Sequence, residues 1–199
     1  MTNETIIRLK SEVLDVLENN ILPFWMNKMV DHEHGGFYGR IDGHEQLHAD
    51  AEKGAILNAR ILWSFSAAYR VLSKLQSSTL NPQPSTFNVQ PSTLNVQPPT
   101  FNVQRYLDTA TRAKDFIIDH FIDHEYGGVY WSLDAEGNPL NTRKQFYAIG
   151  FAIYGLSEYA RATGDMEALD YALQLFDYIE EHAFDKEHNG YIEAMARDG

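Results

Sequence analysis

Cysteine is absent from the 199-residue sequence, which rules out disulfide scaffolds, cysteine-ligated zinc, iron–sulfur clusters and thiol nucleophiles. Basic residues are scarce as well: 16 lysines and arginines face 28 aspartates and glutamates, for a formal net charge of −12. A field of that sign repels phosphates and anionic lipids, so we expect neither nucleic acid nor a membrane as a partner. Long apolar runs are also missing. A secretory signal needs roughly 7–15 consecutive apolar residues and a membrane span about 20, so the sequence predicts a cytoplasmic protein.

Aromatic residues, in contrast, are abundant. Phenylalanine, tyrosine and tryptophan make up 13% of the chain, within an apolar fraction of 44%. An apolar fraction of this size supports a core for one ordinary domain or two small ones. The many ring side chains indicate a cleft that handles a flat or ring-shaped ligand.

Residues 75–104 differ in composition from the rest of the chain. They contain no charged residue and five of the seven prolines, and they repeat a heptad as PSTFNVQ, PSTLNVQ and PPTFNVQ. A proline in every heptad removes helix hydrogen bonds, so extended conformations fit better than a coiled coil. We interpret the segment as a disordered low-complexity insert between residues 1–74 and 105–199, the alternative being a recognition tract. A fold tolerates such an insert because loop-closure entropy grows slowly with length.

A longer repeat becomes visible once this segment is set aside. The stretches DHEHGGFYGRID (31–42), DHEYGGVYWSLD (123–134) and DKEHNGYIEAMA (185–196) share an acidic start, a glycine and an aromatic residue. Gly128 and Gly190 are 62 residues apart, and Gly36 and Gly128 are the same 62 apart after the 30-residue segment is removed. Self-similarity at a fixed period indicates stacked supersecondary units.

Each unit contains two helical patterns. Amphipathic stretches alternate with stretches that are apolar on most sides, as the 3.6-residue spacing of their apolar residues shows. The expected helices cover residues 5–20, 55–75, 106–122, 145–163 and 165–182. This alternation predicts a double-layered ring in which the apolar helices line the inside. Two units and the start of a third are present, so we expect the sequence to be part of a longer domain.

The blocks NNILPFWMNKMVDHEHGGFYGRID, AEKGAILNARILWSFSAAYR and DHEYGGVYWSLDAEGNPLNTRKQFYAIGFAIYGLSEYARATGD resemble the N-terminal half of the N-acylglucosamine 2-epimerase family, most closely its cellobiose 2-epimerase branch. The resemblance covers residues 11–74 and 105–196. It implies an all-α fold, about the first half of an (α/α)6 barrel with short β-like turns. It also implies a sugar isomerase of the EC 5.1.3 type, which converts a reducing-end glucose to mannose at C2 or an aldose to a ketose. The implied partner is a small mono- or disaccharide, with no cofactor and no metal.

Three residues are substrate-site candidates through this resemblance. Arg60 matches an arginine that contacts the sugar oxygen near C1 and C2, Tyr147 matches a tyrosine that bonds the same sugar, and Trp63 lies on the helical face of Arg60. The alternatives are an arginine paired with a structural carboxylate and a tyrosine inside the core. The resemblance places the acid–base histidines on later inner helices, beyond residue 199. None of the eight histidines here matches them, so we expect no catalytic residue within this chain and an incomplete, inactive fragment.

Weaker candidates surround the glycine pairs. Tyr38, Tyr130 and Trp131 are candidate sugar platforms or core residues, and the acidic turns beginning at Asp31 and Asp123 are candidate metal ligands or solvated caps. The other functions left open are a glycoside-degrading enzyme on a similar helical barrel and a non-catalytic sugar-binding remnant. The sequence leaves the oligomeric state and the identity of the sugar open.

Overall fold

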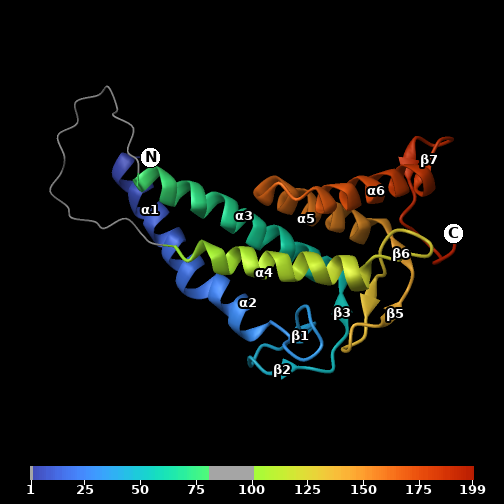
Figure 1. The fold of residues 1–199 in the computed structure, drawn as a ribbon, viewed down its shortest axis with the longest axis horizontal. Helices are drawn as coiled ribbons and strands as arrows, with labels where there is room; N and C mark the ends of the chain where they lie inside the picture. Colours follow the sequence, from blue (N-terminus) through green and yellow to red (C-terminus); the bar gives the residue numbers. More distant parts are fainter. Residues whose placement is uncertain (1, 81–100) are drawn as a thin grey trace.

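The computed structural model describes residues 2–80 and 101–199, and within them the chain is mainly helical (Figure 1). The helices are α1 (Asn3–Val16), the π-helical turn η1 (Leu17–Ile21), α2 (Leu22–Lys28), α3 (Ala55–Leu80), α4 (Val103–Phe116), the π-helical turn η2 (Ile117–Phe121), α5 (Phe146–Thr163) and α6 (Met166–His182). The predicted helices are therefore confirmed in type and approximate position. No helix in the described ranges is long and apolar enough to cross a bilayer.

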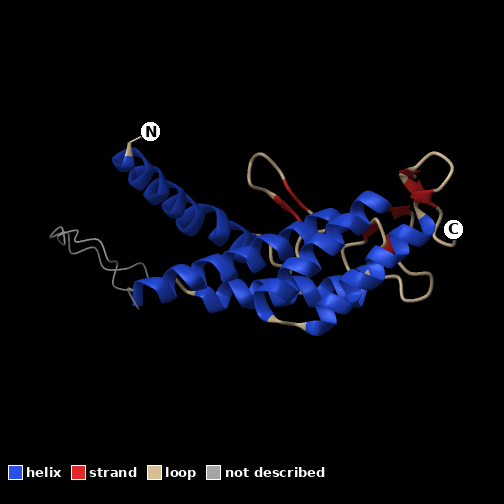
Figure 2. Cartoon of the chain, turned by 90° about the horizontal axis from the view of Figure 1, so that it is seen from above, coloured by secondary structure: helices blue, strands red, loops and turns tan. Residues whose placement is uncertain are grey.

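Short antiparallel strands connect the helices and lie away from the N-terminal end of the molecule (Figure 2). The pairs are β1 (Arg40–Ile41) with β2 (Leu47–His48), β3 (Lys53–Gly54) with β4 (Ser132–Leu133), β4 with β5 (Pro139–Asn141), β6 (Lys144–Gln145) with β9 (Ala194–Met195), and β7 (Phe184–Asp185) with β8 (Gly190–Tyr191). Strands β3 and β6 lead directly into α3 and α5, so they fix where these two helices begin.

Helices α3 and α5 form an inner layer, and the other helices lie outside it. Helix α3 packs against both α4 and α5, and α5 packs against α6. The buried apolar residues form one core cluster that draws on all of these helices. The alternation of inner and outer helices confirms the double-layered arrangement expected from the sequence.

The two inner helices approach closely at Gly155. A Cβ atom added there would lie 2.8 Å from the carbonyl oxygen of Ala59 and 3.2 Å from the side chain of Leu62. Only glycine leaves room for this contact between the helix backbones. The close approach holds the exposed faces of α3 and α5 side by side.

The 62-residue repeat is visible in three dimensions. Asp31, Asp123 and Asp185 each accept hydrogen bonds from the backbone amides two and three residues further on. The glycine pairs of the first two turns have positive φ, and an aromatic ring from the next outer helix covers each of them. These rings belong to Phe116 and Tyr178, which are themselves 62 residues apart.

Helix boundaries near the expected insert differ from the composition-based bounds of 75–104. Helix α3 continues to Leu80, and α4 begins at Val103. The physical reason at the first boundary is that the segment LQSSTL contains no proline, and helix breakers start only at residue 82. The expected disorder of the insert is therefore wrong for residues 75–80 and 103–104, which are helical, and residues 81–100 lie outside the described residues.

Candidate functional site

The candidate site is the face of α3 and α5 that the outer helices leave uncovered. On α3 this face carries Arg60 and Ser64, both exposed, together with the half-buried Trp63. On α5 it carries Tyr147 and Tyr154, which are 64% and 45% exposed. Neighbouring positions on the same helices point into the core, so the helical period itself separates these side chains from the buried ones. The structure thus brings all three sequence candidates to one layer.

Aromatic rings make up most of this face. Trp63 and Tyr154 stack across the two helices, with ring centroids 4.9 Å apart and planes inclined by only 9°. Phe151 meets Tyr147 edge-on at 4.9 Å and Tyr154 edge-on at 6.3 Å. Exposed aromatic surface of this kind suits the apolar face of a pyranose ring.

Arg60 is available for a ligand. Its side chain makes no hydrogen bond or ion pair with any residue that the structure describes. It borders a cavity of about 260 Å³ between α2 and α3, together with Trp25 and Leu57. The alternative of an arginine paired with a structural carboxylate is therefore wrong for the described residues. An anionic or polar oxygen of a ligand would supply the missing acceptor.

Tyr147 is likewise no core residue. Its ring is 64% exposed, and its hydroxyl has no hydrogen-bond partner among the described residues. It lies in the first turn of α5, directly after β6. The alternative of a core aromatic with a satisfied hydroxyl is wrong, and the phenol is free to bond a ligand.

Buried lysine–aspartate pairs fix the starts of both inner helices. Lys53 Nζ donates to Asp31 Oδ2 at 2.7 Å and to the Gly35 carbonyl at 2.8 Å, and Lys144 Nζ donates to Asp123 Oδ2 at 2.7 Å. All four side chains are 0% exposed. The interpretation of these aspartates as solvated caps is therefore wrong: they cap their turns, but inside the protein. The sequence signal was a lysine just before each apolar helix.

The electrostatics of these pairs follow from burial and bonding together. Burial disfavours the charged form of both aspartates. Hydrogen bonds from the partner lysines and from the turn amides outweigh this effect, and Asp123 also accepts hydrogen bonds from Arg197. The pKa values of Asp31 and Asp123 consequently lie below the usual range. Burial lowers the pKa of Lys144. These pairs hold structure rather than substrate, since their side chains are fully buried and bonded to one another.

The remaining candidates do not join the exposed face. Tyr130 is buried, its hydroxyl accepts a 3.2 Å hydrogen bond from Arg197 Nη2, and Lys144 Nζ lies 4.8 Å from its ring centroid, so it is a core residue. Tyr38 and Trp131 are half-buried and pack against the core cluster. Within the described ranges no group of three or more histidine, aspartate or glutamate side chains is arranged to hold a metal ion.

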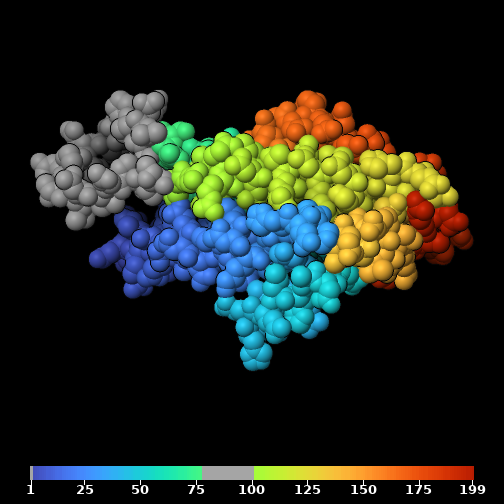
Figure 3. Space-filling model, turned by 60° about the horizontal axis from the view of Figure 1, so that its bottom comes forward, coloured from blue at the N-terminus to red at the C-terminus, as the bar shows by residue number. Residues whose placement is uncertain are grey.

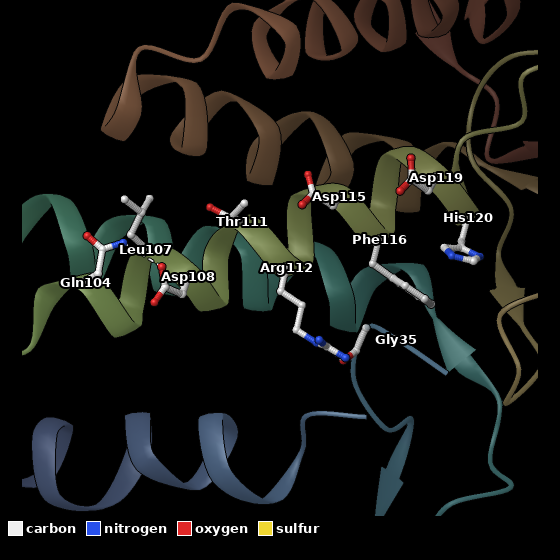
Figure 4. Close-up of a pocket in the computed structure, with 11 residues that line it drawn as sticks. Gly35, Gln104, Leu107, Asp108, Thr111, Arg112, Asp115, Phe116, Asp119 and His120 are labelled. Carbon is white, nitrogen blue, oxygen red and sulfur yellow. Dashed lines mark hydrogen bonds between the residues drawn. The ribbon is translucent and has the colours of Figure 1, made fainter. Parts of the chain in front are cut away.

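Another cavity, of about 540 Å³, lies on the outer layer and away from this face. It is formed between α4 and the first glycine turn (Figure 4). Arg112 projects from α4 toward that turn and bonds the carbonyl oxygens of Gly36 and Asp31, so its charge is already engaged. Asp108 and Asp115 lie on the same helix and Asp119 lies on η2, which continues it. The cavity is a seam between two repeat units and has no free cationic group for a sugar oxygen.

Known proteins resemble this chain along almost its whole length. The family model described as N-acylglucosamine 2-epimerase (GlcNAc 2-epimerase) matches residues 100–198. Cellobiose 2-epimerase of Bacteroides fragilis is 53% identical over 96% of this chain and 41% of its own length, and that of Ruminococcus albus is 42% identical over 94% and 40%. The chain thus spans about two-fifths of the length of the curated relatives it matches.

Solved structures agree with the sequence comparisons. The structure of cellobiose 2-epimerase from Bacillus thermoamylovorans matches with a TM-score of 0.77 and 40% identity, over 94% of this chain and 41% of that one. A family 76 glycoside hydrolase from a bovine Bacteroides thetaiotaomicron strain matches with a TM-score of 0.64 at 14% identity, which shows a shared fold alone. The expected (α/α)6-barrel fold, of which this chain forms a part, is confirmed.

Proposed function

The chain belongs to the N-acylglucosamine 2-epimerase family, and on that premise we propose that it forms the sugar-holding part of a site that epimerises C2 of a reducing-end sugar. The proposed substrate is a small saccharide ending in glucose or mannose, with cellobiose, named in its relatives, as the first to test. The observation that supports the proposal is one exposed face that combines an unpaired guanidinium, a free phenol and stacked aromatic rings.

Epimerisation at C2 requires the removal of a proton from the carbon beside the carbonyl of the open-chain sugar. Negative charge then develops on the carbonyl oxygen. In our proposal the fixed guanidinium of Arg60 stabilises this charge, because a preorganised donor is worth more where charge develops. The Tyr147 hydroxyl donates a hydrogen bond to the same sugar, and the ring pair of Trp63 and Tyr154 supports a pyranose face.

The proton itself needs a base with a pKa near the working pH. Helices α3 and α5 contain no histidine, and their only carboxylate is Glu158. Its side chain is 7% exposed and accepts a 2.6 Å hydrogen bond from Arg70 Nε, so it does not reach a ligand. We propose that histidines in the part of the epimerase fold outside the match move the proton, and that this chain alone binds sugar without epimerising it.

The lack of a free carboxylate on α3 and α5 also argues against a glycoside-degrading enzyme. Such enzymes need a carboxylic acid with a raised pKa beside the scissile bond. Glu158 is ion-paired, and no carboxylate accompanies Arg60 in its cavity. The resemblance to a family 76 hydrolase concerns the fold alone.

Sugar binding tests the proposed role of Arg60 and Tyr147. Titration with cellobiose, followed by saturation-transfer NMR, should show contacts to the reducing-end ring. Arg60→Ala should weaken binding about tenfold, since a charge-assisted hydrogen bond is lost, and Tyr147→Phe should weaken it less. Arg8→Ala on α1, where the arginine is exposed, is the matched control and should bind as the parent does. Equal binding by the Arg60→Ala variant would contradict the proposal.

Exchange of the C2 proton of the sugar tests whether this chain lacks a catalytic base. Cellobiose incubated with the chain in deuterated water should gain no deuterium at C2, because no described group on the inner helices can accept the proton. NMR of the recovered sugar measures this directly. Deuterium at C2 above the protein-free control would show that this chain carries its own base.

A further inference from the structure

The outer helices α2, α4 and α6 lie side by side in that order, coloured blue, green-yellow and orange in the space-filling view (Figure 3). A glycine turn meets an outer helix at two places, which we call junctions. The first junction joins the turn that begins at Asp31 to α4, and the second joins the turn that begins at Asp123 to α6. Phe116 and Tyr178 cover the glycine pairs of the two junctions. The repeat thus gives each residue of the first junction a counterpart in the second.

Arg112 of α4 fills the first junction. Its guanidinium donates to the carbonyl oxygen of Asp31, and its Nε donates to that of Gly36 at 3.1 Å. The Gly36 oxygen also accepts a backbone hydrogen bond from the Asp31 amide, so both of its lone pairs are used. A planar cation with several donors is therefore the group that a junction of this geometry accommodates.

The second junction has a cavity in the corresponding place. The counterpart of Arg112, 62 residues later, is Gln174, whose exposed side chain makes no hydrogen bond with any residue that the structure describes. A cavity of about 290 Å³ lies between α6 and the turn, and its lining includes Gln174, Asp123, Gly127 and Gly128. Since one water molecule takes about 30 Å³ in the liquid, the cavity has room for a guanidinium group and part of an alkyl chain.

The backbone acceptors of the second junction are available to a ligand. The carbonyl oxygens of Asp123 and Gly128 are the counterparts of the two that Arg112 bonds. Among the described residues each accepts one backbone hydrogen bond and none from a side chain, although a carbonyl oxygen can accept two. The Asp123 carboxylate is already bonded to Lys144 and Arg197, so a ligand would bond the carbonyl oxygens instead.

Acidic residues flank the cavity in the pattern that surrounds Arg112. Gln174 has Asp170 four residues before it and Asp177 three residues after it, and Arg112 has aspartates at the same two spacings. Residues at these spacings are neighbours on a helix surface. Asp170 and Asp177 have no ion-pair partner among the described residues. The second junction thus keeps the acidic residues and has a glutamine in place of the cation.

Two aromatic residues add to the fit. Tyr171 and Tyr178 line the cavity, at positions where the first junction has Thr109 and Phe116. The face of an aromatic ring attracts a guanidinium, and the attraction grows when the pair is shielded from water. The Tyr178 hydroxyl is buried without a hydrogen-bond partner among the described residues, and its oxygen is a further acceptor on a residue that lines the cavity.

We propose that the cavity of the second junction binds a guanidinium group carried on an alkyl chain, in the place that Arg112 fills in the first junction. A free guanidino compound and an arginine side chain of another polypeptide present the same group, and the experiment below separates these two sources. The proposal does not rest on the proposed sugar function, because the cavity lies between α6 and a turn whereas the sugar candidates lie on α3 and α5.

Amide NMR of the isotope-labelled chain tests the proposal with butylguanidine as the probe. Its addition should shift the amide signals of Gly127 and Gly128 in a saturable way. Butylurea has nearly the same shape but no charge, so it should bind about tenfold more weakly. N-acetylarginine amide identifies the source: binding as tight as that of butylguanidine indicates an arginine side chain, and binding about tenfold weaker indicates a free small molecule.

The variant Gln174→Arg supplies the guanidinium from the chain itself. It should reduce the affinity for butylguanidine at least about tenfold, because the new side chain occupies the cavity. It should also raise the melting midpoint by about 2–4 °C, because the two carbonyl oxygens gain a charged donor. Phe176→Arg is the matched control, since it adds the same charge at a 51% exposed position of α6 that does not line the cavity. This control should bind and melt as the parent does.

The reverse variant, Arg112→Gln, makes the first junction resemble the second. It should create a second binding site, seen as new saturable shifts of the Gly35 and Gly36 amide signals. Circular dichroism shows whether this variant is folded, and if it is not, Gln174→Arg decides the question alone.

Three results would overturn the proposal. These are the absence of saturable shifts at Gly127 and Gly128, equal binding of butylguanidine and butylurea, and unchanged binding of butylguanidine by the Gln174→Arg variant.

Discussion

The lysine–aspartate pairs show how single residues position the inner helices. Lys53 lies two residues before α3 and Lys144 two before α5, and each reaches back to the aspartate of the preceding turn. The candidate residues Arg60 and Tyr147 follow within two turns of these anchors. A change in either pair should therefore alter both stability and the candidate site.

Removal of one partner should be costly. Lys53→Met leaves the Asp31 carboxylate buried without its ammonium, so we expect the free energy of unfolding to fall by about 3–5 kcal/mol. Urea denaturation followed by circular dichroism measures this value. Lys74→Met, at an exposed position of the same helix, should change it by less than about 0.5 kcal/mol. If Lys53→Met lowered the free energy of unfolding as little as Lys74→Met does, the Lys53–Asp31 pair would contribute little to stability.

The same pairs predict a direction for the pH dependence. The folded-state pKa values of Asp31 and Asp123 lie below the unfolded value of about 3.9. Their contribution to stability is present above that pH and is lost as the pH falls through the folded-state pKa values. Asp31→Asn should make the decline in stability below about pH 5 shallower, and adding Asp123→Asn should flatten it further. Urea midpoints between about pH 3 and 7 test this, and an unchanged slope in the double variant would contradict it.

The sequence predicted the residues of the inner helices better than those of the turns. It selected Arg60 and Tyr147 through matched motifs and Trp63 through the helical face it shares with Arg60, and their role in a sugar site stays a prediction. Helical spacing placed Tyr147 with Phe151 and Tyr154, and these rings are in contact. It did not foresee that the turn aspartates are buried, since a DHE stretch has the composition of a solvated turn. Their partner lysines lie more than twenty residues away, and only the fold brings them together.

At the scale of helices, the contact between α3 and α5 depends on Gly155. Gly155→Ala should destabilise the protein by about 1–3 kcal/mol, because the added Cβ meets backbone that cannot rotate away. Gly150→Ala in the same helix is the control, since nothing lies within 4 Å of its Cβ position. That variant should gain about 0.5–1 kcal/mol from its lower unfolded-state entropy. Thermal melts distinguish the two, and parallel behaviour would mean that the helices adjust without cost.

Helices were predictable as elements because each carries a clear apolar period. The apolar spacing identified α5 and α6, and the stop and cap at Gly164 and Asp165 are confirmed by a left-handed φ of 81° and a side-chain cap. The π-helical turns η1 and η2 were not predicted, because one extra residue in a turn leaves no mark on so short a pattern.

For the molecule as a whole, the segment between α3 and α4 should be dispensable. In the next unit only Gly164 and Asp165 connect α5 to α6. Replacing residues 81–100 with a short glycine–serine linker should therefore leave a cooperative melt, with the midpoint changed by only a few degrees. Loss of cooperativity would show that the segment contributes to folding rather than interrupting it.

The overall architecture was predictable because repetition carries information that a single helix lacks. The interval from Gly128 to Gly190 fixed the unit, and its agreement with the corrected interval from Gly36 defined the insertion. The sequence could not show which surfaces the neighbouring units leave uncovered, since exposure of Val13 or Leu9 depends on what is packed beside α1.

Each turn in this chain is locked by the unit that follows it. The first turn receives Lys53 and Phe116, and the second receives Lys144 and Tyr178, all from later in the chain. Asp185 has only the exposed His188 as an ionic partner among the described residues. Each of the first two turns is therefore fully bonded only when the elements that follow it in the chain are folded against it. Amide exchange with deuterium should accordingly be faster around the third turn than around the first and second.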